Sequence, residues 1–206
     1  MTWGRLRIAP GFLLLIAAIT LLDSGGLCFW ICAAALWHEG GHLLALFMSG
    51  GRLDRLELSL LGLNLVAKPG LSYSKDILCC LAGPAASLAG ALLAGHMDLY
   101  ALSGFSLTLG LFNLLPLPTL DGGRILSLFL QWRWDTQALW VADAVALAVA
   151  VALTMGGLVL LWRTRYNVTL LASGLYALLH VTGGRYVRKN RVHSAQRAKT
   201  GALHGR

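Results

Sequence analysis

Charged residues are scarce in this chain. Only 13% of its 206 residues are Asp, Glu, Lys or Arg, whereas 57% are hydrophobic, and the mean hydropathy is +0.67. So few polar groups cannot cover a soluble core, and the composition therefore indicates an all-α polytopic membrane protein. From the length of the sequence we expect one membrane domain and no sizeable soluble module.

Acidic residues are the rarer charged class, with nine against seventeen basic ones and a net charge of +8. Such an excess is also seen in nucleic-acid-binding proteins, but here seven basic residues fall within 185–206, a stretch without any acid. Basic segments beside apolar spans usually mark the cytoplasmic side of a membrane. We therefore expect the lipid bilayer, and no nucleic acid, as a partner.

The same charge distribution divides the chain into two parts. Residues 1–184 are predicted to form an integral membrane domain. Residues 185–206 are predicted to be a flexible cytoplasmic tail that is attracted to anionic lipid, or that merely determines the topology. With only four cysteines, all in or beside apolar segments and two of them adjacent, the chain has no disulfide framework.

A His-Glu-x-x-His pattern lies inside an apolar stretch from about residue 27 to 48. If this stretch is helical, His38 and His42 lie one turn apart on the same face and can bind one metal ion. Glu39 beside them is placed to act as the general base of a metal-assisted hydrolysis. Each ionisable group in a spanning helix costs roughly 2.5–3.5 kcal/mol on insertion scales, which favours a functional zinc site over a chance pattern.

Two cysteines on the same predicted helix are excluded as further ligands. Cys32 precedes His38 by six residues, which corresponds to about 9 Å along a helix axis. Zinc–sulfur bonds are only about 2.3 Å long. Cys32, and Cys28 one turn before it, are therefore expected to pack as small apolar residues.

Six membrane spans are predicted from the apolar runs, with both termini in the cytoplasm. A signal peptide is the alternative for the first run, but Ala-x-Ala is absent and an uncleaved helix is favoured. The third run contains Pro84 among small residues and is expected to pack closely against the histidine helix. The six spans are expected at about 8–22, 27–48, 77–94, from 102 onward, 139–161 and 168–181.

Residues 52–67 change to an alternating polar and apolar pattern. This pattern is typical of strands and predicts a small membrane-surface β-hairpin between the second and third spans. A plain interfacial loop is equally compatible with it. A hairpin at 56–65 would be able to pair with an extended protein substrate by strand addition.

Two polar residues lie beside the prolines that end the fourth predicted span. Asn113 precedes Pro116 and Pro118, and Asp121 precedes Gly122-Gly123. Polar groups on broken backbone at membrane depth are tolerated only inside protein or at a water-filled cavity. Zinc hydrolases commonly use three protein ligands and keep one position for water, so Asp121 is predicted to be the third zinc ligand.

In combination, these motifs resemble the site-2 protease family of intramembrane zinc metalloproteases, and most closely its stage IV sporulation protein FB branch. The resemblance covers roughly residues 26–133. It rests on HEGGH at 38–42, AGP at 82–84, NLLP at 113–116 and LDGGR at 120–124.

The resemblance implies a zinc-dependent endopeptidase of the bacterial cytoplasmic membrane that carries out regulated proteolysis. It implies one zinc ion per chain on His38, His42 and Asp121, with Glu39 as the base. Asn113 is implied as a substrate or oxyanion contact, and a sporulation sigma-factor precursor as the substrate.

The chain departs from the family pattern at three points. Family members often have Asn a few residues after the Gly-Pro, where this chain has Ser87. No PDZ-like insertion is expected. Nor do we expect the C-terminal CBS domain of the sporulation branch.

Two other functions remain alternatives at this stage. A zinc transporter of the ZIP type also carries His-Glu-x-x-His in a span, but it needs further ionisable residues in a neighbouring span. An inactive membrane-binding homologue predicts a broken site, whereas all ligand candidates and Glu39 are present. Asp143 and His180 lie in the last two predicted spans and are weaker ligand candidates.

Overall fold

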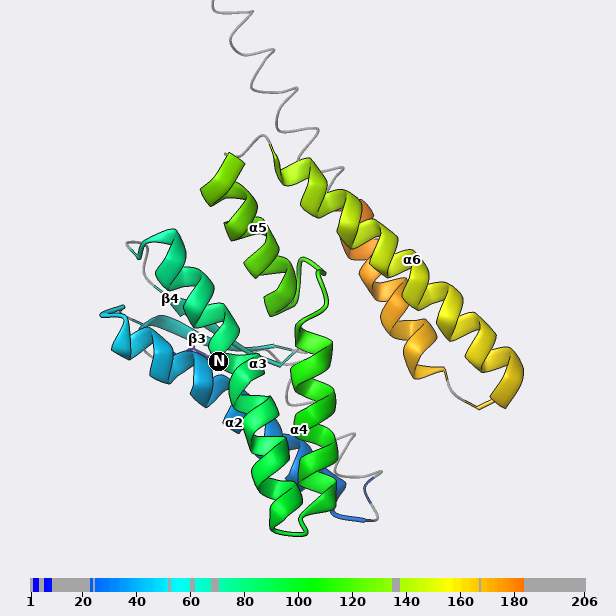
Figure 1. Ribbon diagram of the computed structural model, residues 1–206. Helices are drawn as coiled ribbons and strands as arrows, with labels where there is room; N and C mark the ends of the chain where they lie inside the picture. Colours follow the sequence, from blue (N-terminus) through cyan, green and yellow to red (C-terminus); the bar gives the residue numbers. More distant parts are fainter. Residues whose placement is uncertain are drawn as a thin grey trace, which may run out of the picture.

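The structure is a computed structural model in which helices predominate (Figure 1). The predicted first span lies outside its described residues except for Ile8, and the predicted tail lies outside them entirely. The described residues are 2–3, 6–8, 23, 25–51, 53–59, 62–67, 71–134, 138–166 and 168–183.

Helix α2, Leu27–Met48, is the apolar stretch that carries the histidines. It begins after Gly26, whose φ of 70° is a left-handed conformation that glycine adopts without strain. The Asp23 carboxylate accepts hydrogen bonds from the backbone N–H groups of Cys28 at 2.7 Å and Leu27 at 2.9 Å. These two bonds lower the pKa of Asp23 below its ordinary value. Asp23 thus satisfies donors that the helix start leaves without intrahelical partners.

Helices α3, Tyr73–His96, and α4, Tyr100–Asn113, form a bundle with α2 (Figure 1). A tight connection after His96 leads directly from α3 into α4, and the Leu99 N–H donates to the Ala94 carbonyl. The two helices approach closely at small residues, since a Cβ at Gly110 of α4 would lie 3.0 Å from the Cβ of Ser87 on α3.

Helix α5, Asp121–Trp134, is a correction to the sequence analysis, which treated this region as broken backbone. The prolines do end α4, but only the segment 114–120 is irregular, and a new helix begins at Asp121. A Cβ at Gly122 or Gly123 would overlap the backbone carbonyls of Leu114 and Leu117 respectively. The two glycines therefore allow the segment to fold back onto the first turn of α5.

Helix α6, Leu139–Thr164, pairs with a shorter final helix, Thr169–Gly183, and the two are called the C-terminal hairpin below. Figure 1 shows this hairpin on the opposite side of α5 from the α2–α4 bundle. Its core consists of alanines and one valine, and Leu117 from the segment before α5 inserts into it. The buried members are Ala146, Ala150, Ala177 and Val181.

A four-stranded sheet occupies the region where the sequence predicts a hairpin or a loop. Strands β3, Leu53–Ser59, and β4, Gly62–Ala67, are antiparallel, with Ser59 paired to Gly62. The sequence analysis missed β1, Thr2–Trp3, and β2, Leu6–Ile8, which extend the sheet in the order β1-β2-β3-β4. Strand β2 is parallel to β3, whereas the other pairs are antiparallel. Ile8, predicted to start a span, is therefore the last residue of a strand.

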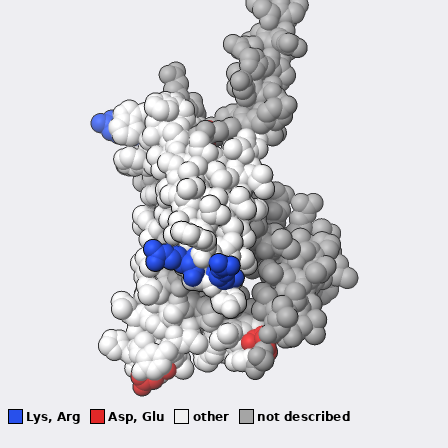
Figure 2. All heavy atoms as spheres, turned by 90° about the vertical axis from the view of Figure 1, so that its right-hand side faces the viewer, with Lys and Arg blue, Asp and Glu red and all other residues white. Residues whose placement is uncertain are grey.

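Within the described ranges, three helices are long and apolar enough to cross a membrane: α2, α3 and α6. The final helix is apolar but shorter, and α4 has 14 residues. Large hydrophobic side chains are exposed on these helices, including Trp162 on α6 at 77% and Leu179 on the final helix at 73%. Figure 2 shows few charged side chains on the hairpin side. Such a surface is typical of lipid-facing helices. The count of six spans stays a prediction.

Candidate metal centre

The two histidines of α2 direct their Nε2 atoms toward each other. His38 and His42 are separated by one helical turn, and their Nε2 atoms are 3.2 Å apart. The rings stand nearly perpendicular, at 82°, with centroids 4.8 Å apart. His38 is 4% exposed, so this pair lies inside the protein, whereas His42 is partly buried.

Asp121 completes the cluster from the first residue of α5. Its Oδ2 atom lies 3.1 Å from the Nε2 atom of each histidine, and the residue is 9% exposed. A carboxylate is favourable here because the start of a helix carries partial positive charge. Folding has thus brought together residues that are 79 or more positions apart in sequence.

The three atoms fit the ligand set of a zinc ion. Ligands at about 2.0–2.1 Å from a tetrahedral ion lie about 3.3 Å from one another, and the observed separations are 3.1–3.2 Å. Two imidazole nitrogens and one carboxylate oxygen are also ligands that zinc accepts. Among the described residues, this is the one group of three or more His, Cys, Asp or Glu side chains whose geometry suits a metal ion.

A backbone carbonyl sets the tautomer of His42. The Nδ1 atom of His42 lies 2.7 Å from the Cys79 carbonyl oxygen on α3. Because a carbonyl can only accept, Nδ1 must carry the proton. In the neutral ring, Nε2 then presents its lone pair to the other two ligand atoms, as metal coordination requires.

His38 has a different partner for its second nitrogen. Its Nδ1 atom lies 2.8 Å from the hydroxyl oxygen of Ser87 on α3. Ser87 is fully buried. Sequence reasoning noted this residue only as a departure from the family pattern and missed its contact with a ligand, because a single serine among small residues is no signal by itself.

Small residues on α3 make room for the α2 side chains, which confirms the predicted close packing of these helices. A Cβ at Gly83 would overlap the imidazole ring of His42. The indole N–H of Trp37 donates to the Ala86 carbonyl at 2.7 Å, and a Cβ at Gly90 would come within 2.7 Å of this indole nitrogen. The small-residue face of α3 therefore allows the side chains of His42 and Trp37 to lie directly against the α3 backbone.

Glu39 follows the first histidine and is half-buried on α2. It interacts electrostatically with His42 and Asp121, and also with Arg124 one turn into α5. A carboxylate on the residue after His38, interacting with two of the three candidate ligands, is compatible with the predicted base, whose role stays a prediction.

The side chain of Asn113, the last residue of α4, donates a hydrogen bond within its own helix. Its Nδ2 atom donates to the Leu109 carbonyl at 3.0 Å, and the side chain is partly buried. The predicted contact of Asn113 with substrate stays a prediction.

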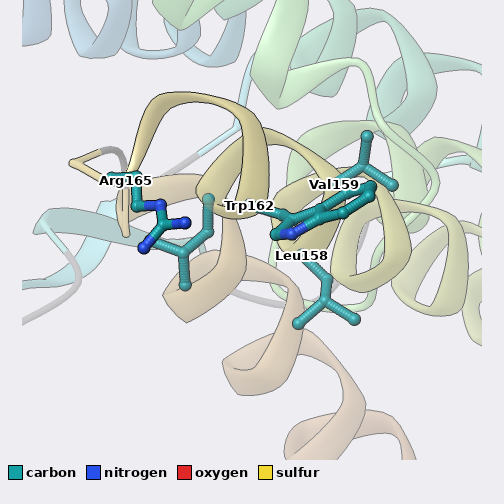
Figure 3. A pocket seen from close by; sticks show the side chains of 5 residues that line it. Leu158, Val159, Trp162 and Arg165 are labelled. Carbon is teal, nitrogen blue, oxygen red and sulfur yellow. The ribbon is translucent and has the colours of Figure 1, made fainter.

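The remaining candidates lie apart from the cluster. Cys28, Cys32, Asp143 and His180 do not belong to the metal-binding group found within the described ranges. A surface hollow at the end of α6 is lined by five residues, four of them labelled in Figure 3, and none is a ligand candidate. The candidate metal ligands are therefore gathered where α2, α3 and α5 meet.

Comparison with known proteins gives three findings. The model of peptidase family M50 matches residues 81–157, which include Asp121 but begin after the two histidines. Curated proteins named "Putative zinc metalloprotease Rip3", from two strains of Mycobacterium tuberculosis, are 33% identical over 150 residues. These matches cover 64% of this chain but only 38% of the relatives' length.

Among solved structures, the site-2 protease from Methanocaldococcus jannaschii superposes with a TM-score of 0.65 at 20% identity. The superposition covers 89% of this chain and 92% of the archaeal chain. The family model and the curated relatives support peptidase family M50 for this chain, and the structural likeness shows that it has the fold of a site-2 protease.

Proposed function

We propose that this chain is a zinc-dependent intramembrane endopeptidase. The observation that carries the proposal is the convergence of His38 Nε2, His42 Nε2 and Asp121 Oδ2 within 3.1–3.2 Å of one another. This cluster is placed between helices of which α2 and α3 are long and apolar enough to span a membrane. Polar groups at such a depth are costly and are usually retained for function.

His38, His42 and Asp121 would hold one zinc ion, and Glu39 would act as the base. Bound zinc supplies a Lewis acid that polarises a peptide carbonyl and acidifies water. Glu39 accepts a proton from the attacking water while the water oxygen bonds to the carbonyl carbon. It then returns this proton to the leaving nitrogen as the carbon–nitrogen bond breaks. Asn113 is proposed to contact the substrate or the developing oxyanion.

A membrane-associated protein is the proposed substrate, and it must unwind locally because a helix hides its carbonyls. Among the described strands, β4 lies at an edge of the sheet, whereas β3 is paired on both sides. This arrangement supports strand addition at β4. Proline scanning through β4, Gly62–Ala67, should slow cleavage without zinc loss only at alternate positions, where the backbone N–H points away from β3.

We further propose a six-span protein of the bacterial cytoplasmic membrane. In this arrangement residues 1–184 form the membrane domain, and the basic tail 185–206 lies in the cytoplasm with the N-terminus. The resemblance to the sporulation branch makes a sigma-factor precursor the first substrate to test. Cysteine labelling at Ser194 in sealed cells tests the topology, because modification by an impermeant reagent from outside would contradict it.

The proposed activity is tested by co-expression with membrane-tethered precursors and mass mapping of the cut. The matched control is Glu39→Gln, which retains every proposed ligand. The proposal is supported if the parental chain cleaves a precursor and Glu39→Gln does not. Zinc uptake into proteoliposomes without cleavage would support a transporter instead.

A further inference from the structure

The two proposed histidine ligands are supported by α3 in different ways. His42 donates from Nδ1 to the Cys79 carbonyl, which leaves that ring one choice of neutral tautomer. His38 faces the Ser87 hydroxyl, which can either accept or donate. The tautomer of His38 therefore depends on the direction of a single side-chain hydrogen bond.

Only one direction is compatible with a ligand role. If Ser87 donates, the neutral His38 ring carries its proton on Nε2, which points at the Nε2 of His42 and the Oδ2 of Asp121. That proton would occupy the direction in which a metal must be bound. If Nδ1 of His38 donates to the Ser87 oxygen, Nε2 presents a lone pair to the same place.

The packing around Ser87 keeps its hydroxyl beside the ring. Ser87 is 0% exposed and His38 is 4% exposed, so water does not compete freely for this bond. Helix α4 backs the serine closely, since a Cβ at Gly110 would lie 3.0 Å from the Ser87 Cβ. The hydroxyl is thus held in a dry, crowded interface, in which an unpaired polar group is costly.

We propose that Ser87 is a positioning residue for the metal centre: its hydroxyl oxygen accepts the Nδ1–H of His38 and directs the Nε2 lone pair toward the metal. This inference rests on the proposed function, because it needs His38 to bind zinc. It gives α3 two orienting contacts, one from a backbone carbonyl and one from a side chain, of which only the second can be removed by substitution.

The test compares Ser87→Ala with Ser106→Ala in the purified full-length protein. Ser106 lies on α4 one turn from Gly110 and is 1% exposed, so it matches Ser87 in residue type and burial. Zinc affinity is measured by competition with a chromophoric chelator, and Co²⁺ absorption reports the geometry of the site. Removing such an orienting partner typically weakens metal affinity by about 10–100-fold, and we expect this loss in Ser87→Ala alone.

A second variant covers the case in which Ser87→Ala fails to fold. Ser87→Cys keeps a side chain of similar shape but replaces the hydroxyl with a weak hydrogen-bonding group, so it should lower zinc affinity as well. Without any variant, ¹⁵N-histidine NMR of the zinc-loaded parental protein should show two rings with protonated Nδ1 and metal-bound Nε2. If the spectrum shows only one ring with protonated Nδ1 and metal-bound Nε2, the inference is wrong.

The outcomes separate the inference from the function beneath it. Unchanged zinc affinity and Co²⁺ spectrum in both Ser87 variants overturn the positioning role and leave the protease intact. Equal losses in Ser87→Ala and Ser106→Ala also overturn it, because they indicate a general packing effect. A parental protein that binds no zinc contradicts the proposed function itself.

Discussion

Two pairs of helices in this chain approach closely at glycines, but the glycines face different groups on the neighbouring helix. In the pair α2 and α3, Gly83 makes space for the imidazole ring of His42. In the C-terminal hairpin, Gly157 on α6 faces backbone, and a Cβ there would lie 2.5 Å from the Leu171 nitrogen. The first glycine accommodates the side chain of a candidate metal ligand, whereas the second only allows two helices to touch.

The surroundings follow the same division. The α2–α3 interface buries polar groups that are all hydrogen-bonded, including His38 and Ser87. The core of the hairpin consists of alanine, valine and leucine. Both interfaces therefore use small residues to bring helices into contact, and the α2–α3 interface differs because it encloses the candidate metal ligands. Disturbing the first interface should change metal binding, and disturbing the second should change stability alone.

The largest effect is expected from the proposed ligands and base. His38→Ala, His42→Ala or Asp121→Ala should lower zinc content and cleavage together, because three protein ligands define such a site. Glu39→Gln should keep zinc but cleave about 10²–10⁴-fold more slowly, since an amide cannot accept the proton. Zinc per protein and cleavage rate are measured on all four variants. Parental cleavage by Glu39→Gln would exclude Glu39 as the base.

The next effect tests the glycine that faces His42. Gly83→Ala should lower zinc affinity toward that of His42→Ala, because the new methyl group would occupy the position of the imidazole ring. Alanine is favoured over glycine in helices by about 0.8–1.0 kcal/mol, so poor helix formation would not explain the loss. Chelator competition measures the affinity.

Gly104→Ala on α4 is the matched control, because no atom lies within 4 Å of the added Cβ. It should keep parental affinity. If Gly83→Ala also keeps it, the close fit between α3 and the histidine ring is not needed for metal binding.

A smaller effect, on stability alone, is expected in the hairpin. Gly157→Ala should reduce the free energy of unfolding by about 1–3 kcal/mol, the usual cost of overpacking, because the backbone of the final helix must move. At its neighbour Gly156, an added Cβ would have no atom within 4 Å, so Gly156→Ala should be neutral or slightly stabilising. Thermal denaturation in detergent measures both. Zinc loss in Gly157→Ala would show that the two regions are coupled.

Long apolar runs were the features best predicted from sequence. The span expected at about 27–48 is α2, Leu27–Met48, and that expected at 139–161 is α6, Leu139–Thr164. Such runs are local and their length is set by the bilayer. Helix α5 was missed because Gly122-Gly123, which lies in its first turn, is a pair of residues that usually interrupts a helix. Strands β1 and β2 were missed because they have two and three residues, and β2 pairs with β3 far along the chain.

The candidate site divides in the same way. Sequence motifs nominated His38, His42 and Asp121, which the structure brings together. The groups that orient the histidines have no such signature. The carbonyl of Cys79 is a backbone group that every residue has, so the residue type at this position does not reveal the contact. The contact of Ser87 with His38 depends on how two helices pack, and the residues next to Ser87 in sequence do not reveal it.

The smallest effect should arise at the start of α2, far from the metal centre. Asp23→Ala removes the acceptor for three backbone N–H groups and should raise amide hydrogen exchange in the first turn of α2. His38 lies eleven residues further on, about 16 Å along the axis, so zinc content should stay parental. Because the pKa of Asp23 is lowered in the folded protein, this capping is fully present above the ordinary value of 3.8 and is lost only as the pH falls below it. Protection of this turn, corrected for intrinsic exchange rates, should therefore be constant from about pH 5 to 8. A steady decline across that range would show that Asp23 does not hold the start of the helix.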